Sequence, residues 1–238
     1  MRHFRSLALT LAVFSFATLG HAQSAPPAAP AQPAAAPVPS VGQAVTKVQQ
    51  FYDKTTSFKA NFNQEFFVKA YDQRKKSHGK VTFAKPGKMD WVYEDPKDNR
   101  VVSDGAILRV YDASNHQMYE QPVDKSQSPG ASSYPVALSF LTGQGKLTDS
   151  FTFEIAGGDK MAFPGGYVLI GTPITANPAY VKVFFYVDAQ TSQVRRVMVL
   201  DGQGNRNRFD FENPRINEPV TADQFKFTPP PGTQVIKP

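Results

Sequence analysis

The chain contains no cysteine among its 238 residues. It therefore forms no disulfide bonds, and a hydrophobic core has to stabilise the fold unaided. The same absence excludes zinc sites built on thiolates, and it excludes a lipid-modified N-terminal cysteine.

Residue types that carry catalysis are also scarce. Only four histidines are present, and His78 and His116 lie among polar residues, without a second histidine at metal-ligand spacing. No serine occupies a G-x-S-x-G motif, and the carboxylates are scattered over turns, where they usually bond the backbone. We expect no catalytic site, metal or cofactor. A carboxylate pair assembled by folding is the remaining enzymatic alternative.

Basic residues are not concentrated in one region. The formal net charge is +6, and only Arg74–Lys76 forms a basic run. Because a nucleic-acid interface needs a concentrated basic stripe, we expect no nucleic-acid partner.

The first 22 residues have the pattern of an export signal. Two arginines precede the apolar run Leu7–Leu19, and small residues follow at Gly20 and Ala22. The apolar run of about 13 residues is shorter than the about 20 residues of a membrane helix. We therefore expect residues 1–22 to be a cleaved signal peptide, with an uncleaved anchor as the alternative.

Residues 23–39 are rich in alanine and proline and carry neither a charge nor an aromatic side chain. This composition predicts a polyproline-like or disordered tether. A single folded domain is expected over residues 40–238.

The folded domain starts with a helix pattern and continues as strands. Ser40 and Gln43 form a capping box before apolar residues at helical spacing, which predicts a helix ending near Tyr52. From Phe58 the apolar period changes to two, which indicates strands. A second short helix is expected at 135–142. Turn residues separate the expected strands, which are 58–66, 79–85, 89–94, 100–103, 107–111, 117–119, 151–155, 167–171, 180–187, 193–200, 207–211 and 224–227. Strands of this number predict one all-β sheet that curls or closes.

The stretch Lys80–Tyr93 contains two alternating apolar runs separated by Pro86-Gly87, which predicts two strands joined by a turn. Lys85 lies by parity on the apolar side, one residue before this turn. A cation there either extends out of a rim or has a partner. Elsewhere, 181–187 is apolar on both faces, so the sheet is either covered on both faces or encloses a cavity for an apolar ligand.

Six segments occur in a recognisable order: the first helix, Ser57–Gln64, Gly79–Pro86 with Trp91 and Tyr93, Val102–Gly105 with Tyr111, Leu138-x-x-Leu141, and Phe225–Pro230. Together they resemble the periplasmic outer-membrane lipoprotein carrier (LolA) family over about residues 41–236. The resemblance implies an incomplete, strongly curved antiparallel β-barrel of about eleven strands, with a lid of short α-helices over an apolar cavity.

The resemblance also implies a function and partners. Such a protein is a soluble, non-enzymatic carrier in the periplasm, and we expect a monomer. It takes acylated lipoproteins from an inner-membrane ABC transporter and passes them to an outer-membrane lipoprotein acceptor. The acceptor has the same fold but is itself a lipoprotein, which a chain without cysteine is not.

The resemblance assigns roles to individual residues. Lys85 stands where the family usually has an arginine that holds the lid shut, so Lys85 is the expected lid latch, although lysine offers a point charge in place of a planar fork. Met89 falls where the family has an apolar residue facing the cargo. Further candidates for acyl-chain binding, for which an ordinary core role stays equally open, are Phe62, Phe66, Val81, Phe83, Trp91, Leu138 and Leu141.

Two other binding functions fit the same sequence. One is a carrier of the same fold for another amphiphile, such as a glycolipid or a pigment lipid. The other is a periplasmic adaptor or sensor that recognises lipoproteins without transporting them. The sequence does not distinguish these cargoes.

Overall fold

The computed structural model describes residues 38–123, 142–143, 145–176 and 178–237. The chain divides into two units, residues 1–34 and 35–238, and the described residues all belong to the second unit. Among them, no helix combines the length and the apolar character needed to cross a membrane.

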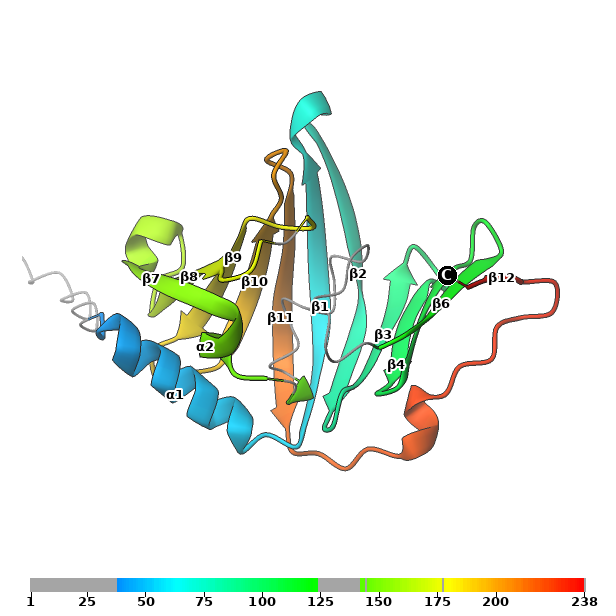
Figure 1. Cartoon of the computed structure of the whole chain (residues 1–238), viewed down its shortest axis with the longest axis horizontal. Coiled ribbons are helices and arrows are strands. Elements are labelled where there is room, and N and C mark those ends of the chain that lie inside the picture. Colours follow the sequence, from blue (N-terminus) through cyan, green and yellow to red (C-terminus); the bar gives the residue numbers. More distant parts are fainter. Residues whose placement is uncertain (1–37, 124–141, 144, 177, 238) are drawn as a thin grey trace, which may run out of the picture. The chain divides into compact units, whose positions relative to one another are not determined.

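The described elements begin with a helix and continue with strands, as the sequence predicts, but the helix at 147–150 and the strand at 234–236 were not predicted (Figure 1). Their bounds are α1 (Val41–Asp53), β1 (Ser57–Val68), η1 (Lys69–Tyr71), β2 (Gln73–Ala84), β3 (Lys88–Asp95), β4 (Arg100–Asp104), β5 (Ile107–Asp112), β6 (Gln117–Pro122), α2 (Leu147–Ser150), β7 (Phe151–Gly157), η3 (Gly158–Met161), β8 (Gly166–Pro173), β9 (Lys182–Asp188), β10 (Val194–Leu200), β11 (Arg206–Ile216), η4 (Ala222–Phe225) and β12 (Gln234–Ile236).

Helix α1 begins with the predicted capping box. The Ser40 hydroxyl accepts the N–H of Gln43, and the Gln43 side chain accepts the N–H of Ser40, so two of the four N–H groups without a partner in the helix are satisfied. The apolar face of the helix is buried through Ala44, Val45, Val48 and Tyr52. Most of the stability of so short a helix comes from packing this face.

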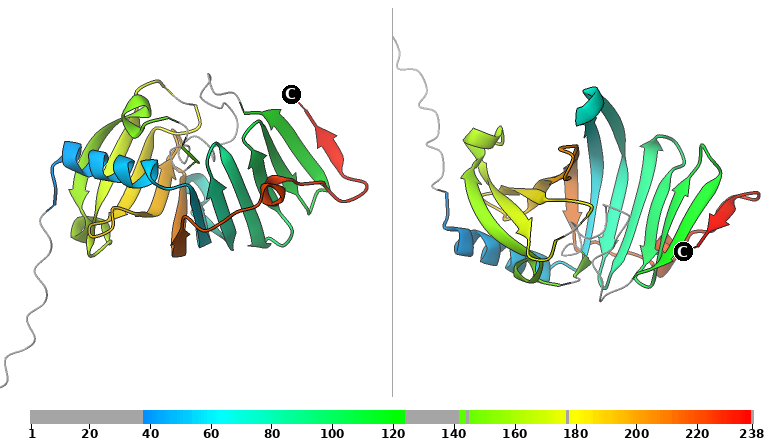
Figure 2. Two further views of the ribbon diagram at one scale, coloured as in Figure 1. Left: turned by 90° about the horizontal axis from the view of Figure 1, so that it is seen from below. Right: turned by 45° about the horizontal axis from the view of Figure 1, so that its top comes forward.

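The strands form one twelve-stranded sheet in the order β12-β6-β5-β4-β3-β2-β1-β11-β10-β9-β8-β7 (Figures 1 and 2). Neighbouring strands are antiparallel except β12 and β6, which are parallel. The pairing of β1 with β11 joins the two halves of the chain near the middle of the sheet. The sheet is open, with β12 and β7 at its edges, and its twelve strands are one more than the about eleven that the family resemblance implies. Of the expected lid, the second helix at 135–142 lies outside the described residues except for Thr142.

One face of the sheet carries the apolar core. Phe58 of β1 lies opposite Phe83 of β2, and Trp91 of β3 lies opposite Val81. The alternation predicted from the sequence sets this register, since a slip by one residue would turn every core side chain to the other face.

The prediction of a strand at 224–227 is wrong. Residues Ala222–Phe225 form a short 3-10 helix that contacts β3 and β4 from outside the sheet. Arg100 fixes this segment: its guanidinium donates to both carboxylate oxygens of Asp90, at 2.8 and 3.0 Å, and to the carbonyl oxygen of Gln224 at 3.1 Å. Phe225 is 1% exposed, so the segment is packed on the sheet rather than paired within it.

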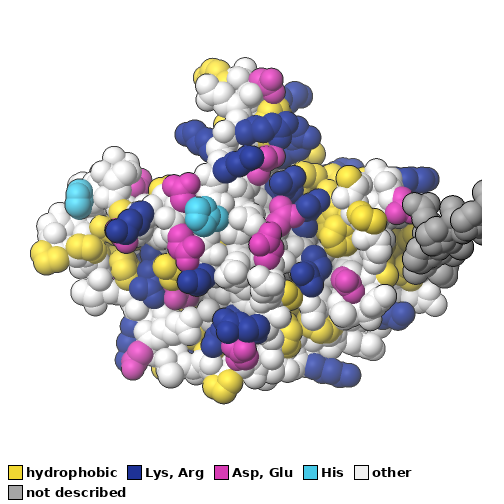
Figure 3. Space-filling model, turned by 180° about the vertical axis from the view of Figure 1, so that it is seen from behind, with side chains coloured by type: hydrophobic (Ala, Val, Ile, Leu, Met, Phe, Trp, Pro, Cys, Tyr) yellow, Lys and Arg dark blue, Asp and Glu magenta, His cyan; other side chains and the backbone are white. Residues whose placement is uncertain are grey.

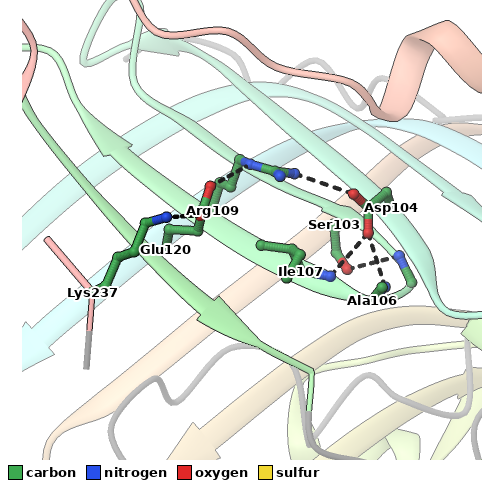
Figure 4. A network of polar contacts seen from close by, with 8 residues as sticks. Ser103, Asp104, Ala106, Ile107, Arg109, Glu120 and Lys237 are labelled. Carbon is green, nitrogen blue, oxygen red and sulfur yellow. Dashed lines mark hydrogen bonds and ion pairs between the residues drawn. The ribbon is translucent and has the colours of Figure 1, made fainter. Parts of the chain in front are cut away.

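Beyond this segment, β12 pairs with β6 and a network of ion pairs follows (Figure 4). The Lys237 ammonium lies 3.0 Å from a Glu120 oxygen, and the Arg109 guanidinium lies 2.9 Å from the other one. Arg109 also contacts Asp104 at 3.2 Å. Burial raises the pKa of Asp104, but N–H donors of Ile107 and Ala106 and the Arg109 charge outweigh it and hold that pKa below its ordinary value.

Candidate functional site

Lys85 joins the end of β2 to the end of α1. Its ammonium group donates hydrogen bonds to the carbonyl oxygens of Tyr52, at 2.6 Å, and Asp53, at 3.1 Å. Both carbonyls belong to the last turn of α1, and the Tyr52 carbonyl also accepts the backbone N–H of Thr55 at 3.1 Å. A positive charge there also interacts favourably with the helix dipole. The sequence left two environments open for this lysine, extension out of a rim or a bonded partner. The structure shows the bonded partner.

Thr142 and Gly143 contact Lys85 and the turn that follows it. The N–H of Gly87 donates to the carbonyl oxygen of Thr142 at 3.0 Å. Gly143 has a φ of +73°, and a Cβ atom on it would lie 2.7 Å from Cε and 2.9 Å from Cγ of Lys85. The absence of a side chain at Gly143 therefore leaves room for the extended lysine stem.

Two further contacts hold the C-terminal half of α1. The backbone N–H of Val194 in β10 donates to the phenol oxygen of Tyr52 at 3.0 Å. The N–H of Leu147, the first residue of α2, donates to the side-chain carbonyl of Gln49 at 2.8 Å. Burial raises the pKa of Tyr52 well above its ordinary value, so this phenol stays neutral. Helix α1 is thus bonded to β2, β10 and α2.

A cluster of aromatic rings lies on the apolar face of the central strands. Three phenylalanine rings surround the Trp91 indole at centroid distances of 4.9 Å for Phe62, 5.6 Å for Phe83 and 5.3 Å for Phe209, all in edge-on geometry. Trp91 is 1% exposed. Such contacts add to the hydrophobic stabilisation of the buried rings.

This core contains five of the residues expected to bind acyl chains, each at most 6% exposed: Phe62, Val81, Phe83, Met89 and Trp91. Phe66, near the far end of β1, is only partly buried. Leu138 and Leu141 lie outside the described residues. Because the five buried side chains are packed against the protein's own atoms, their contact with a cargo stays a prediction.

Polar groups border the aromatic cluster towards the far end of β1. The Tyr93 hydroxyl donates to the side-chain oxygen of Gln64 at 3.1 Å, and the Gln64 amide donates to the side-chain oxygen of Asn207 at 2.9 Å. Buried amides need hydrogen-bond partners, and this chain of bonds offsets the cost of removing these polar groups from water beside the rings. The apolar core therefore extends from these residues towards Lys85.

A hollow of about 560 Å³ is lined by residues of β1, β10 and β11 and of the segments around 163–164 and 188. Its lining includes Arg196, Arg208 and Asp210, and the Asp210 carboxylate bridges the two guanidinium groups. Charged side chains of both signs dominate this lining. The hollow is therefore not the apolar cavity that the sequence resemblance implies.

A family model and the relatives found by sequence agree on one family. The family described as "Outer membrane lipoprotein carrier protein LolA" matches residues 53–228. An outer-membrane lipoprotein carrier protein from Nitrosomonas europaea is 27% identical over 206 residues, which cover 84% of this chain and 92% of that protein. One from Coxiella burnetii is 25% identical over 201 residues, covering 84% and 90%. An uncharacterized conserved protein from Thermus thermophilus has a similar fold, with a TM-score of 0.51 and 12% identity over 84% of this chain and 100% of that chain. Because the family match spans most of the chain, this protein belongs to the LolA family of outer membrane lipoprotein carrier proteins.

Proposed function

We propose that this protein is a monomeric periplasmic carrier of triacylated lipoproteins. It receives them from an inner-membrane ABC transporter, shields their acyl chains and passes them to an outer-membrane acceptor. The names of its relatives, which describe a carrier and not an enzyme, support this role. The observation that carries the proposal is the contact of Lys85 with α1 beside a large aromatic core, because it places a polar side chain that holds the end of a helix next to a large buried apolar region.

The physical chemistry of the cargo favours direct transfer. Hiding three acyl chains of about 16 carbons from water, at roughly 0.8 kcal/mol per methylene, represents tens of kcal/mol. Release of such a cargo into water would be too slow for transport. The acyl chains therefore pass directly from one apolar site to the next, and the carrier holds them less tightly than the acceptor does.

Lys85 acts in this proposal as the latch of the apolar core. In the closed state its ammonium group holds the last turn of α1. Cargo binding breaks these bonds, α1 moves away from the sheet, and the apolar contacts with the acyl chains compensate for the loss. Met89 lies opposite Phe83, one residue pair from the turn that follows Lys85, so it would be among the first residues to meet an entering chain. Its flexible thioether adapts to varied acyl chains.

A release assay tests the carrier role. Mature protein, without residues 1–22, is added to spheroplasts that contain labelled lipoproteins, and label in the supernatant is measured. We expect the protein to bring lipoproteins into solution and mass spectrometry to find acylated polypeptides bound to it. A protein that binds lipoproteins without releasing them would be an adaptor or sensor, and recovery of a free glycolipid alone would identify a carrier of another amphiphile. Either result refutes the proposal.

The latch is tested by Lys85→Leu with Lys59→Leu as its matched control. Lys59 also extends from a strand to a backbone carbonyl, that of Pro219 at 3.0 Å, and its ion pair is with Glu218 at 3.6 Å, so the bonds it makes are far from α1 in sequence. We expect Lys85→Leu to release lipoproteins from spheroplasts yet to transfer them poorly to acceptor-containing membranes, because the open form is no longer disfavoured. The Lys59→Leu protein should transfer cargo normally. Normal transfer by Lys85→Leu would contradict the latch.

A further inference from the structure

The hairpin of β1 and β2 extends beyond the neighbouring strands (Figures 1 and 2). Its two strands pair from Ser57 opposite Ala84 to Val68 opposite Gln73. The end of the hairpin is formed by η1 and Asp72. We refer to residues 69–76 as the hairpin tip.

The hairpin tip is basic and exposed to solvent throughout. It contains Lys69, Arg74, Lys75 and Lys76 against a single acidic residue, Asp72, and each residue of the tip is exposed. Figure 3 shows dark blue side chains gathered at this projecting end. Tyr71, at the extremity, is 75% exposed, which is the largest exposure among the large hydrophobic residues that the structure describes.

Contacts below the tip hold it in place. The Phe67 ring lies between two guanidinium groups, with Arg74 at 4.7 Å and Arg206 at 4.5 Å from the ring centroid. The backbone N–H of Lys69 donates to the side-chain oxygen of Asn205 at 2.9 Å, which ties the tip to the turn before β11. The tip is therefore a supported projection and not a loose loop.

The lysines of the tip are free to meet an external anion. Arg74 forms an ion pair with Glu65 at 2.8 Å. Within the described part of the chain, by contrast, neither Lys69 nor Lys75 nor Lys76 has an acidic side chain within ion-pair distance. Since no acidic side chain is bonded to these lysines, their solvent counter-ions are readily displaced by a surface of negative charge.

We propose that the hairpin tip docks this protein on the surface of a bilayer that contains anionic phospholipid. Lysine and arginine side chains are attracted to anionic headgroups, and tyrosine prefers the headgroup level of a bilayer. The tip joins both features at the end of one projection, with Tyr71 foremost and the cations around it. This inference concerns the membrane surface and does not depend on the cargo.

The shape of the tip favours a bilayer over an acidic protein. A folded partner usually offers a matching pocket to a buried aromatic anchor and a fixed set of carboxylates to the cations. The tip is narrow and convex, and its three unpaired lysines have flexible stems. A soft layer of headgroups surrounds such a projection, so lysines on both faces of the hairpin meet headgroups when the tip enters the layer.

Sedimentation with vesicles tests the proposal. Mature protein is mixed at low ionic strength with vesicles of phosphatidylethanolamine and phosphatidylglycerol, or with phosphatidylcholine alone. The tip variant is Lys69→Gln/Lys75→Gln/Lys76→Gln. The control, Lys97→Gln/Lys146→Gln/Lys160→Gln, removes the same charge from exposed lysines elsewhere. Circular dichroism and thermal melting confirm that both variants fold.

We expect the wild-type protein and the control to bind the anionic vesicles and to dissociate at high salt. Each lysine near an anionic surface contributes about fivefold to binding, so the tip variant should bind about a hundredfold more weakly. Equal loss in the control, equal binding to phosphatidylcholine, or no binding by the wild-type protein would overturn the proposal. Retention on polyglutamate without binding to vesicles would overturn it as well, in favour of an acidic protein partner.

A fluorescence measurement tests the position of Tyr71. The native Trp91 is 1% exposed, so its emission is already that of a buried indole. In Tyr71→Trp the added indole starts in water, and we expect its emission to shift to shorter wavelength on anionic vesicles only. An unshifted emission from vesicle-bound protein would show that the end of the tip does not enter the headgroup layer, and it would overturn this orientation.

Discussion

Replacement of Lys85 by leucine should loosen the C-terminal half of α1 without unfolding the sheet. The ammonium group makes two hydrogen bonds, to the carbonyl oxygens of Tyr52 and Asp53, while the apolar face of the helix remains packed. The leucine side chain is shorter and donates no hydrogen bond. The variant therefore removes the polar attachment and leaves the hydrophobic one.

The magnitude follows from the two bonds. A hydrogen bond from a charged donor contributes about 1.5–3 kcal/mol when well formed, and solvent reaches part of this site and replaces some of that energy. The two bonds together then stabilise the attached helix end by about 2 kcal/mol, a factor of about 30 in its opening equilibrium.

Hydrogen exchange followed by mass spectrometry measures this opening directly. Amides of residues 48–53 should exchange about 30-fold faster in Lys85→Leu than in the wild-type protein. Amides of β1 and β11 should be unchanged, because their pairing does not involve Lys85. Lys85→Arg keeps the positive charge and should remain close to the wild-type protein, and Lys59→Leu should leave α1 unaffected. Equal exchange of the helix end in Lys85→Leu and the wild-type protein would refute the reasoning.

Two further predictions concern the core. Trp91→Ala leaves a cavity among three phenylalanine rings and should lower the free energy of unfolding by about 3–5 kcal/mol. Urea titration at neutral pH measures it, and a loss below about 1 kcal/mol would mean that the cluster is loosely packed. Because burial raises the pKa of Tyr52 above its ordinary value, the unfolded chain releases the phenol proton first as pH rises above about 10, and the folded state loses stability. The urea midpoint should therefore fall further from pH 8 to pH 10.5 in the wild-type protein than in Tyr52→Phe. The phenylalanine variant loses the bond from Val194, which lowers its stability equally at both pH values. Equal falls in the two proteins would contradict the assignment.

The sequence was sufficient for elements that local signals specify. The capping box at Ser40 locates the start of α1, and the alternation after Phe58 locates β1 and its buried face. The turn residues Pro86-Gly87 separate β2 from β3 as predicted. In each case the signal lies within the element or directly beside it.

The segment at 224–227 shows where local signals fail. Its alternating phenylalanines indicate a strand, but Phe225 and Phe227 both contact the outside of the sheet, with the Phe227 ring 5.0 Å from the Arg100 guanidinium and 5.4 Å from the Tyr111 ring. An extended segment that packs on a sheet buries every second residue, and so does a strand that is paired within a sheet. The difference lies in the backbone partners, which carry no sequence signature.

The partner of Lys85 was hidden for a related reason. Parity placed the cation correctly beside the apolar face, but its acceptors are main-chain carbonyls 33 and 32 residues earlier. The available clue was that the last carbonyls of any helix need donors. Nothing in the sequence indicates that Gly143, whose missing side chain leaves space for the lysine stem, lies against Lys85.

The open sheet has a consequence for self-association. Edge strands present unpaired N–H and C=O groups, which invite strands from other molecules. At one edge, β12 covers β6 with only three residues, and the bond between Lys237 and Glu120 fastens the chain directly after it. A short outermost strand beside a charged residue is a poor template for fibril growth. Removal of this strand would leave the six-residue strand β6, with Tyr119 at 49% exposure, as an unpaired edge of the sheet. We expect that edge to promote aggregation.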